Sequence, residues 1–348
     1  MTWFKSVGDK LQCTLCPRDC KLSDGQRGMC FARIREGDEI KLAAYGKASG
    51  FAMDPIEKKP LNHFYPGTSV LSFGTAGCNL ACKFCQNWDI SKARDQERLT
   101  DEASPVAIAA AAKRAGARSV AFTYNDPTIF AEYAMDVADA VHEQGLATVA
   151  VSAGYIYPEP RAELYAKIDA ANIDLKAFTD EFYWKQAAAH LEPVKDTLKY
   201  LVTETDVWTE ITTLIIPTLN DSDRELTEMS EWIMGELGPD VPLHFSAFHP
   251  DYKLADLPRT PPATLTRARE IAMKTGLRYV YTGNVHDREG DQTLCPGCGT
   301  AVISRDWYEI LGAELTRMGA CARCGTQIPG RFEEQIGNWG RKRMRVLV

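Results

Sequence analysis

The chain has 348 residues, of which 45% are hydrophobic and 25% charged, values that are ordinary for a folded protein with a sizeable core. Its net charge of −7 gives no general case for nucleic-acid binding, and we interpret the basic tail at residues 341–345 as a solvated end. No apolar run reaches the roughly 18–20 residues of a membrane span, and no signal peptide follows Met1. We expect a cytoplasmic protein with one large α/β domain and small appendages.

Eleven cysteines in a cytoplasmic chain indicate metal sites, because disulfides are disfavoured in that compartment. They fall along the chain into groups of four, three and four, with none left over: Cys13, Cys16, Cys20 and Cys30; Cys78, Cys82 and Cys85; Cys295, Cys298, Cys321 and Cys324. This division predicts two closed metal sites that flank one open site.

Loop residues dominate the N-terminal segment, residues 1–40, and such a segment cannot bury enough apolar surface to fold alone. A metal held by its four cysteines would supply the missing folding energy. Four thiolates fit zinc, and they fit an iron–sulfur cluster equally well. The spacing does not decide between the two; we favour a structural metal over four free thiols.

The stretch from Gly77 to Asn87 follows an apolar run at residues 69–74 that reads as a short buried strand. An iron–sulfur cube normally takes four thiolates. Here three cysteines are spaced Cys-x3-Cys-x2-Cys, and the next cysteine is Cys295. Three thiolates would leave one iron of the cube without a protein ligand. An open coordination position is the mark of a catalytic metal site, as it is for zinc. The alternatives are buried cysteines or a redox pair with a bystander, and the glycine-rich, polar flanks argue against both.

After this loop, helices and strands alternate. We predict helices over residues 105–115, 127–144, 159–167, 223–237 and 263–275, helical material up to about residue 204, and strands over 118–123, 147–152, 172–176, 208–216, 243–248 and 278–282. Such alternation is typical of right-handed βαβ units and a parallel sheet. About six repeats favour a barrel-like arrangement, complete or open. A doubly wound sheet is the alternative, but no Gly-x-Gly-x-x-Gly follows the first strand.

Polar residues gather where these strands end, which is where a barrel places its working residues. The candidates are Asp126, Ser152, Gly154, Asp174, Lys176, His244 and Asn284. Some have a structural interpretation as well. Asp126 precedes a proline and is a candidate helix N-cap. Asp174 and Lys176 point to one face of a strand and are a candidate ion pair, and His244 is equally a candidate core histidine.

The C-terminal cysteines form two knuckles, each Cys-x2-Cys followed by a glycine, with 22 residues between them. This pattern is typical of a four-cysteine zinc ribbon. We expect zinc, or a rubredoxin-like iron, in this module rather than free thiols. The module either binds a partner or closes one end of the barrel.

The three-cysteine loop, with Phe84 before its last cysteine, is similar to the signature of radical S-adenosylmethionine (SAM) enzymes. Over essentially its whole length the chain resembles the pyruvate formate-lyase-activating branch of that superfamily. More closely, it resembles the radical SAM enzyme of the AmmeMemoRadiSam system, which is encoded alongside Memo-like and AMMECR-like proteins. The resemblance rests on the cysteine-rich ends and on residues 78–87, 124–127, 173–176 and 216–220.

This resemblance implies a partial (β/α)6 TIM-like barrel at residues 41–288, between the cysteine-rich segment 1–40 and a zinc-ribbon-like module with a basic tail at 289–348. It implies an enzyme in which Cys78, Cys82 and Cys85 hold a [4Fe–4S] cluster whose unique iron binds SAM. Reductive cleavage of SAM would give a 5′-deoxyadenosyl radical that removes hydrogen from a substrate. Activating enzymes commonly carry Gly-Gly-Glu where this chain has Tyr-Asn-Asp at 124–126, so Asp126 departs from the pattern. The expected cofactor contacts are Phe84, Asn87, Asp126, Ser152, Gly154, Asp174, Lys176, His244 and Asn284.

Three hypotheses follow for the reaction and its partners. The first is hydrogen abstraction from a protein glycine, and the second is modification of a small molecule or of a partner protein, with the Memo-like and AMMECR-like proteins as candidate partners. The third is a non-catalytic iron–sulfur and zinc scaffold or electron carrier. An enzyme of this kind needs an electron donor such as flavodoxin or ferredoxin. The eight further cysteines weigh against the first hypothesis, because a minimal activating enzyme needs only the triad.

Overall fold

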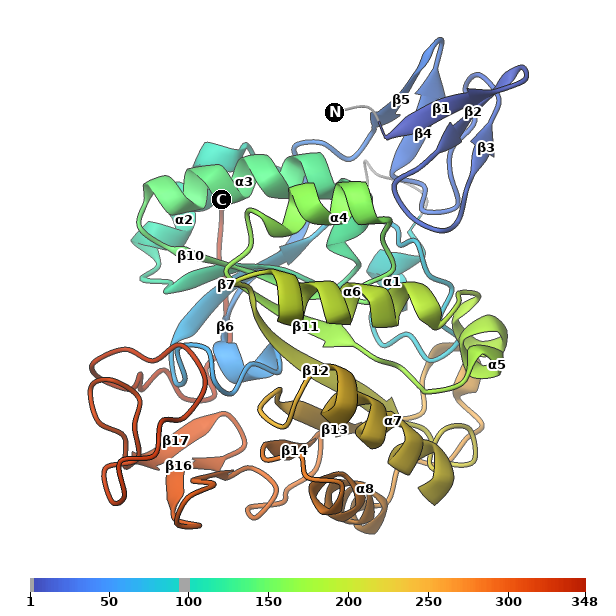
Figure 1. The fold of residues 1–348 in the computed structure, drawn as a ribbon. Coiled ribbons are helices and arrows are strands. Elements are labelled where there is room, and N and C mark those ends of the chain that lie inside the picture. Colours follow the sequence, from blue (N-terminus) through green and yellow to red (C-terminus); the bar gives the residue numbers. More distant parts are fainter. Residues whose placement is uncertain (1–2, 94–100) are drawn as a thin grey trace.

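The structure is a computed structural model that describes residues 3–93 and 101–348. At its centre lies a large sheet with the strand order β14-β13-β12-β11-β10-β9-β7-β6-β18, and β8 pairs with β6 (Figure 1). These strands are β6 (Lys47–Pro55), β7 (Ser69–Gly74), β8 (Asp101–Glu102), β9 (Ser119–Phe122), β10 (Ala147–Ser152), β11 (Ala170–Asp174), β12 (Trp208–Ile215), β13 (Leu243–Ala247), β14 (Val280–Gly283) and β18 (Met344–Arg345). From β7 to β14 every neighbouring pair is parallel, whereas β6 is antiparallel to both β7 and β18.

A helix links each parallel strand to the next. These helices are α2 (Pro105–Arg114), α3 (Ala131–Glu143), α4 (Pro158–Tyr165), α6 (Glu192–Glu204), α7 (Asp223–Glu236) and α8 (Pro262–Lys274). The parallel strands follow one another in chain order and the order never reverses, so right-handed crossovers place all of these helices on one face of the sheet (Figure 1). The predicted barrel-like arrangement is confirmed in its open form, and the doubly wound alternative is wrong.

Shorter helical elements lie in the connections. They are η1 (Ile56–Lys58), α1 (Trp88–Ser91), η2 (Pro127–Phe130), α5 (Asp180–Phe182), the π-helix η3 (Tyr183–Ala187) and η4 (Tyr252–Leu254). The helix predicted from residue 127 therefore begins as the 3-10 turn η2. The strand predicted at residues 172–176 lies two residues earlier, at β11, which leaves Lys176 just beyond its end.

Local sequence explains where the helices begin. The Ser104 hydroxyl accepts a hydrogen bond from the Ala107 backbone N–H at 3.2 Å, and a proline occupies the first helical position of α2. Ser222 caps α7 in the same way through the Glu225 N–H, at 3.3 Å. These caps satisfy backbone donors that have no partner within the helix, which is why both predicted helix starts are confirmed within a residue.

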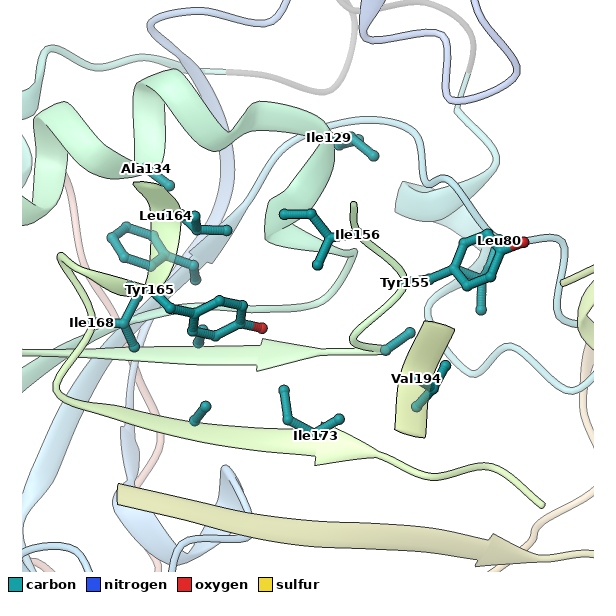
Figure 2. Packing of buried hydrophobic residues seen from close by; sticks show 14 of the residues in the cluster. Leu80, Ile129, Ala134, Tyr155, Ile156, Leu164, Tyr165, Ile168, Ile173 and Val194 are labelled. Atoms are coloured by element: carbon teal, nitrogen blue, oxygen red, sulfur yellow. The ribbon is translucent and has the colours of Figure 1, made fainter. Parts of the chain in front are cut away.

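The main core lies between the sheet and its helices. In Figure 2, Leu164 and Tyr165 of α4 lie above β10 and β11, where Ile173 points towards the helices. Leu164, Tyr165 and Ile173 are each at most 2% exposed. Burial of one such side chain contributes about 1.5–3 kcal/mol to folding, so this layer makes a rigid base for the loops at the strand ends.

The N-terminal segment contains more regular structure than its composition indicated. β1 (Phe4–Val7), β2 (Lys10–Cys13) and β3 (Lys21–Leu22) form a small antiparallel sheet, and β4 (Arg33–Glu36) pairs with β5 (Glu39–Leu42). Loops and turns still make up most of residues 3–40, as expected, and these short strands lie between them. β5 also runs across residue 40, the predicted end of the segment.

The C-terminal module contains a second small antiparallel sheet of β15 (Thr293–Leu294), β16 (Ala301–Asp306) and β17 (Glu309–Ala313). The chain then returns to the central sheet, where β18 pairs with β6. The interpretation of residues 341–345 as a solvated end is therefore wrong for the backbone of Met344 and Arg345. In the described part of the chain, every helix is too short or too polar to cross a bilayer.

Candidate active site and metal centres

A cavity of about 260 Å³ lies at the carboxyl ends of the parallel strands. Segments far apart in the sequence contribute its wall. Of the residues predicted to bind the cluster or SAM, those that line the cavity are Cys78, Cys82, Phe84, Cys85, Asn87, Asp126, Ser152, Asp174, Lys176 and Asn284. The fold therefore brings together most of the predicted site, while Gly154 and His244 lie outside this lining.

The turn that follows β9 holds the cysteine loop in place through hydrogen bonds. The side chain of Asn125 donates to the Gly77 carbonyl oxygen at 2.8 Å and to the Thr75 hydroxyl at 3.0 Å, and it accepts from the Thr75 N–H at 3.1 Å. The amide of Asn79 donates to the Tyr155 carbonyl at 2.9 Å. Sequence reasoning missed Asn79 and Asn125 as positioning residues. The available signal was an amide side chain in a buried turn after a strand.

The outer side of the loop is held by the π-helix η3. The Ala81 and Lys83 N–H groups donate to the carbonyl oxygens of Ala187 and Gln186, at 2.9 and 2.8 Å. A π-helical turn frequently marks a functional site. This one ends at Ala187, so the carbonyls of its last residues have no partner within the helix. Here those carbonyls bind the segment between the cysteines, which sequence reasoning did not foresee.

Two thiols of the cysteine loop are buried, and burial makes their thiolate forms costly. Burial raises the pKa of Cys78 to about 12, and the nearby carboxylate of Asp126 acts in the same direction. Burial also raises the pKa of Cys82, although the Lys176 ammonium opposes it. A thiolate is costly here unless a cation takes up its charge, and iron does so.

Asp126 is both a helix cap and part of the cavity wall. Its carboxylate accepts from the Thr128 N–H at 3.0 Å, the Ala153 N–H at 2.7 Å and the Ser152 hydroxyl at 3.1 Å. The predicted N-cap of η2 is confirmed. The Ser152 hydroxyl in turn accepts from the Gly154 N–H at 3.0 Å, so Gly154 supports this wall from behind.

Asp174 and Lys176 form the predicted ion pair, with 2.8 Å between Nζ and the carboxylate oxygen. Burial would favour the neutral amine, but Asp174 and the neighbouring Cys82 hold the pKa of Lys176 above its ordinary value. The ammonium lies 5.9 Å from the centre of the Phe84 ring. Since Asp174 is 35% exposed in the cavity, the pair offers one anionic and one cationic group to a ligand.

His244 belongs to a different buried network. Its Nε2 lies 2.7 Å from the carboxylate of Glu210, which also accepts from the backbone N–H groups of Asn62 and His63 and from the Trp208 indole. Burial opposes ionisation of Glu210, yet the hydrogen bond and charge of His244 and the other donors hold its pKa below its ordinary value. Residues Asn62 and His63 precede β7, so this carboxylate ties that segment to β12.

A second cavity, of about 350 Å³, adjoins the first, and His244 lines it. The two cavities share Gln86, Asn87, Thr123, Tyr124, Val151, Thr212, Ser246 and Asn284. The C-terminal module supplies the far wall through Arg305, Trp307 and Tyr308. Compounds bound in the two cavities would therefore lie next to each other.

The C-terminal cysteines form a compact group. Their four sulfurs all lie within 4.8 Å of one another, with 3.5 Å between Cys295 and Cys324 and 3.8 Å between Cys298 and Cys321. Four sulfurs around one tetrahedral ion at a metal–sulfur distance of about 2.3 Å stand roughly 3.8 Å apart. The predicted metal-binding group is therefore present with spacing that suits a single ion, and zinc remains our prediction for its identity.

Comparisons with known proteins agree with this architecture. Residues 73–229 match the sequence model of the Radical SAM superfamily. An uncharacterized protein of Methanocaldococcus jannaschii is 41% identical over 332 residues, which cover 94% of this chain and 98% of that protein.

Two solved structures share the fold. A radical SAM methyltransferase from Sphaerobacter thermophilus matches with a TM-score of 0.52 and 16% identity, over 81% of this chain and 77% of that one. Streptococcus suis SuiB bound to S-adenosylmethionine matches with a TM-score of 0.50 and 16% identity, over 66% of this chain and 53% of that one. Since the signature loop, the open barrel and the family match all coincide, this chain belongs to the radical SAM superfamily of enzymes.

Proposed function

We propose that this enzyme binds SAM in the 260 Å³ cavity and removes a hydrogen atom from a substrate held in the adjoining 350 Å³ cavity. The observation that carries the proposal is the shared wall. The three cysteines line the first cavity together with Asp174 and Lys176, and that cavity opens onto the second through common residues. A radical generated in one cavity would then meet a substrate in the other without crossing bulk water.

The triad suits an iron–sulfur cluster better than a single ion. Among the described residues, the three sulfurs do not form a group whose members all lie within 4.8 Å of one another. Each thiolate of a cluster binds a separate iron, so wider spacing is what a cluster requires. When bound, the cluster supplies the electron that cleaves the sulfonium C–S bond of SAM to methionine and a 5′-deoxyadenosyl radical.

The chain's own residues would orient SAM by charge and shape. Lys176 is cationic and matches the methionyl carboxylate. The partly exposed Asp174 carboxylate matches the ribose hydroxyls or, through a cation, the same end of the ligand. Asp126 already accepts three hydrogen bonds, so it contributes negative charge beside the ammonium of SAM. Phe84, 5% exposed, gives the wall an apolar part next to the cysteines.

The substrate is an organic molecule or a protein segment that reaches the second cavity. That cavity combines cationic and aromatic side chains, with Lys58 and Arg305 beside Trp307 and Tyr308. A minimal activating enzyme needs only the three-cysteine loop, so it would not need a cavity wall supplied by the C-terminal metal-binding module. We therefore place a small molecule or a partner protein of the AmmeMemoRadiSam system, Memo-like or AMMECR-like, ahead of a glycyl-radical enzyme.

The test is production of 5′-deoxyadenosine from SAM under anaerobic conditions with dithionite. The Cys82→Ala variant should lose cluster iron and fall to the background rate, while it keeps the C-terminal metal and the melting temperature of a folded chain. If Cys82→Ala produced 5′-deoxyadenosine at the wild-type rate, the assignment of the triad would be wrong. Incubation with candidate partners, followed by electron paramagnetic resonance, would reveal a glycyl radical and so favour the activating-enzyme alternative.

A further inference from the structure

We propose that Cys13, Cys16, Cys20 and Cys30 hold a second iron–sulfur cluster, next to the radical SAM site, in place of the structural zinc that four thiolates equally allow. All four side chains line one cavity in the N-terminal segment. Cys13, Cys16 and Cys30 are each 9% exposed, and Cys20 is half-buried at the rim. Such a group has the ligand number of a complete cluster with no open iron.

The spacing of the sulfurs separates the two kinds of metal centre. Among the described residues, the C-terminal cysteines alone form a group of three or more ligands whose donor atoms all lie within 4.8 Å of one another. The N-terminal four surround a common space with a wider spread, as do the three cysteines of the radical SAM loop. One chain thus contains a compact four-cysteine group that fits one ion and a wide one that fits a cluster, whose thiolates bind separate irons.

Donors around the sulfurs suit a buried anionic cluster. Backbone N–H groups of Leu15, Arg18 and Arg33 donate towards the sulfurs of Cys13, Cys16 and Cys30, in that order. Hydrogen bonds of this kind help to set the reduction potential of a cluster.

Two arginines line the same cavity. Arg33 is neutralised by Glu132, with both N–O distances 2.5 Å. Arg18 donates to the carbonyls of Asn79 and Ala187, at 2.7 and 3.4 Å, and makes no ion pair within the described residues. The carboxylate of Asp19 lines this cavity as well and offsets the charge of Arg18. The wall therefore has no excess positive charge, and bound irons would have to take up the charge of the four thiolates.

The cavity shares a wall with the radical SAM loop. Asn79, which follows Cys78, lines the N-terminal cavity. On the other side of Cys78, Gly77 has a φ of +98°, and a Cβ there would lie 1.9 Å from the Cys30 carbonyl oxygen. Cys78 therefore lies between two residues that touch the N-terminal site, so the two centres are close neighbours.

This adjacency points to electron relay, a role that rests on the proposed function. A low-potential flavodoxin or ferredoxin would give one electron to the N-terminal cluster at its half-buried Cys20 edge. The reduced cluster would pass that electron to the radical SAM site and return to its oxidised state, so that one electron enters and one leaves for each SAM cleaved.

The ligand assignment is tested by metal analysis of the full-length protein, purified and reconstituted anaerobically. We expect about eight irons and one zinc per chain for the wild type, and about four irons with one zinc for Cys16→Ala. Cys82→Ala should also retain about four irons, and its spectrum should be that of the N-terminal cluster alone. About four irons with two zincs in the wild type, or unchanged iron in Cys16→Ala, would overturn the proposal.

The relay is tested separately with Cys20→Ser, whose side chain lies at the rim, so that folding is better preserved. SAM cleavage driven by reduced flavodoxin or ferredoxin should fall at least tenfold more than cleavage driven by dithionite, which reduces the radical SAM site directly. Equal loss with both reductants would refute the relay. Failure of the proposed function would look different, because the wild type itself would then form no 5′-deoxyadenosine with either reductant.

Discussion

Replacement of Glu210 with glutamine tests whether one buried carboxylate holds the segment before β7 against the barrel. Each of its oxygens accepts two hydrogen bonds. One takes the His63 N–H at 2.7 Å and the Trp208 indole at 2.9 Å, and the other takes the Asn62 N–H at 2.9 Å and the His244 ring at 2.7 Å. Glutamine offers one acceptor oxygen and an NH₂ group that can only donate. If that oxygen keeps the bonds from His63 and Trp208, the Asn62 N–H loses its acceptor. The His244 ring can accept from the NH₂ group only in its other tautomer.

The expected cost follows from that count. A buried donor left unsatisfied costs about 1–3 kcal/mol, and removal of one member of a buried charged network typically costs about 3–5 kcal/mol. We therefore expect a loss of about 1–5 kcal/mol. Glu210 is 0% exposed, so water cannot replace the missing acceptor.

The measurement is the free energy of unfolding from guanidinium titration of the metal-loaded protein, followed by tryptophan fluorescence. The matched control is Glu231→Gln on the exposed face of α7, which should change stability by less than about 0.5 kcal/mol. A loss below about 1 kcal/mol for Glu210→Gln, or one equal to that of the control, would refute the network as a structural support.

The remaining predictions concern ligand binding, pH and the cysteine loop. Asp174→Asn should weaken SAM binding in calorimetry by about tenfold, because it removes one charged hydrogen-bond partner, whereas the exposed Asp139→Asn should bind SAM as the wild type does. Burial raises the pKa of Glu57 to about 7 from 4.5, so the folded state holds this proton more tightly and stability should fall as the pH rises from about 4.5 to 7. Glu57→Gln should remove that fall, at most about 3 kcal/mol, and an unchanged pH profile of unfolding would contradict the assignment. Gly77→Ala should lower cluster occupancy, measured as iron per chain, because its Cβ would collide with the Cys30 carbonyl. Full occupancy would contradict this prediction, because it would show that the backbone at Cys30 moves aside without disturbing the cysteine loop.

The parallel core could be predicted because its signals are local. Residues 147–152 are a continuous run of mostly apolar residues between Gly145 and Gly154, and β10 has these same bounds. Ser104 followed by proline marks the start of α2 through its own cap. Most of the candidate residues at the strand ends line one cavity, because parallel strands all end at the same edge of a sheet.

The features that were missed depend on contacts between distant segments. Nothing in the sequence around Tyr183–Ala187 distinguishes a π-helix from an α-helix, and its carbonyls find their partners in the cysteine loop more than a hundred residues earlier. His244 was predicted either to contact SAM or to be a core histidine. The sequence does not show its hydrogen bond to Glu210 on the neighbouring strand. The second cavity exists only because Arg305, Trp307 and Tyr308 of the C-terminal module meet the barrel.

The pairing of β18 with β6 has a practical consequence for work on this enzyme. Met344 and Arg345 occupy one edge of the central sheet, and their partners on β6 are Met53 and Ala52. Without them, the backbone N–H and C=O groups of β6 on that side would be open to strands from other molecules. A variant lacking residues 344–348 should therefore self-associate at high protein concentration, and an affinity tag added after Val348 would lie next to this edge.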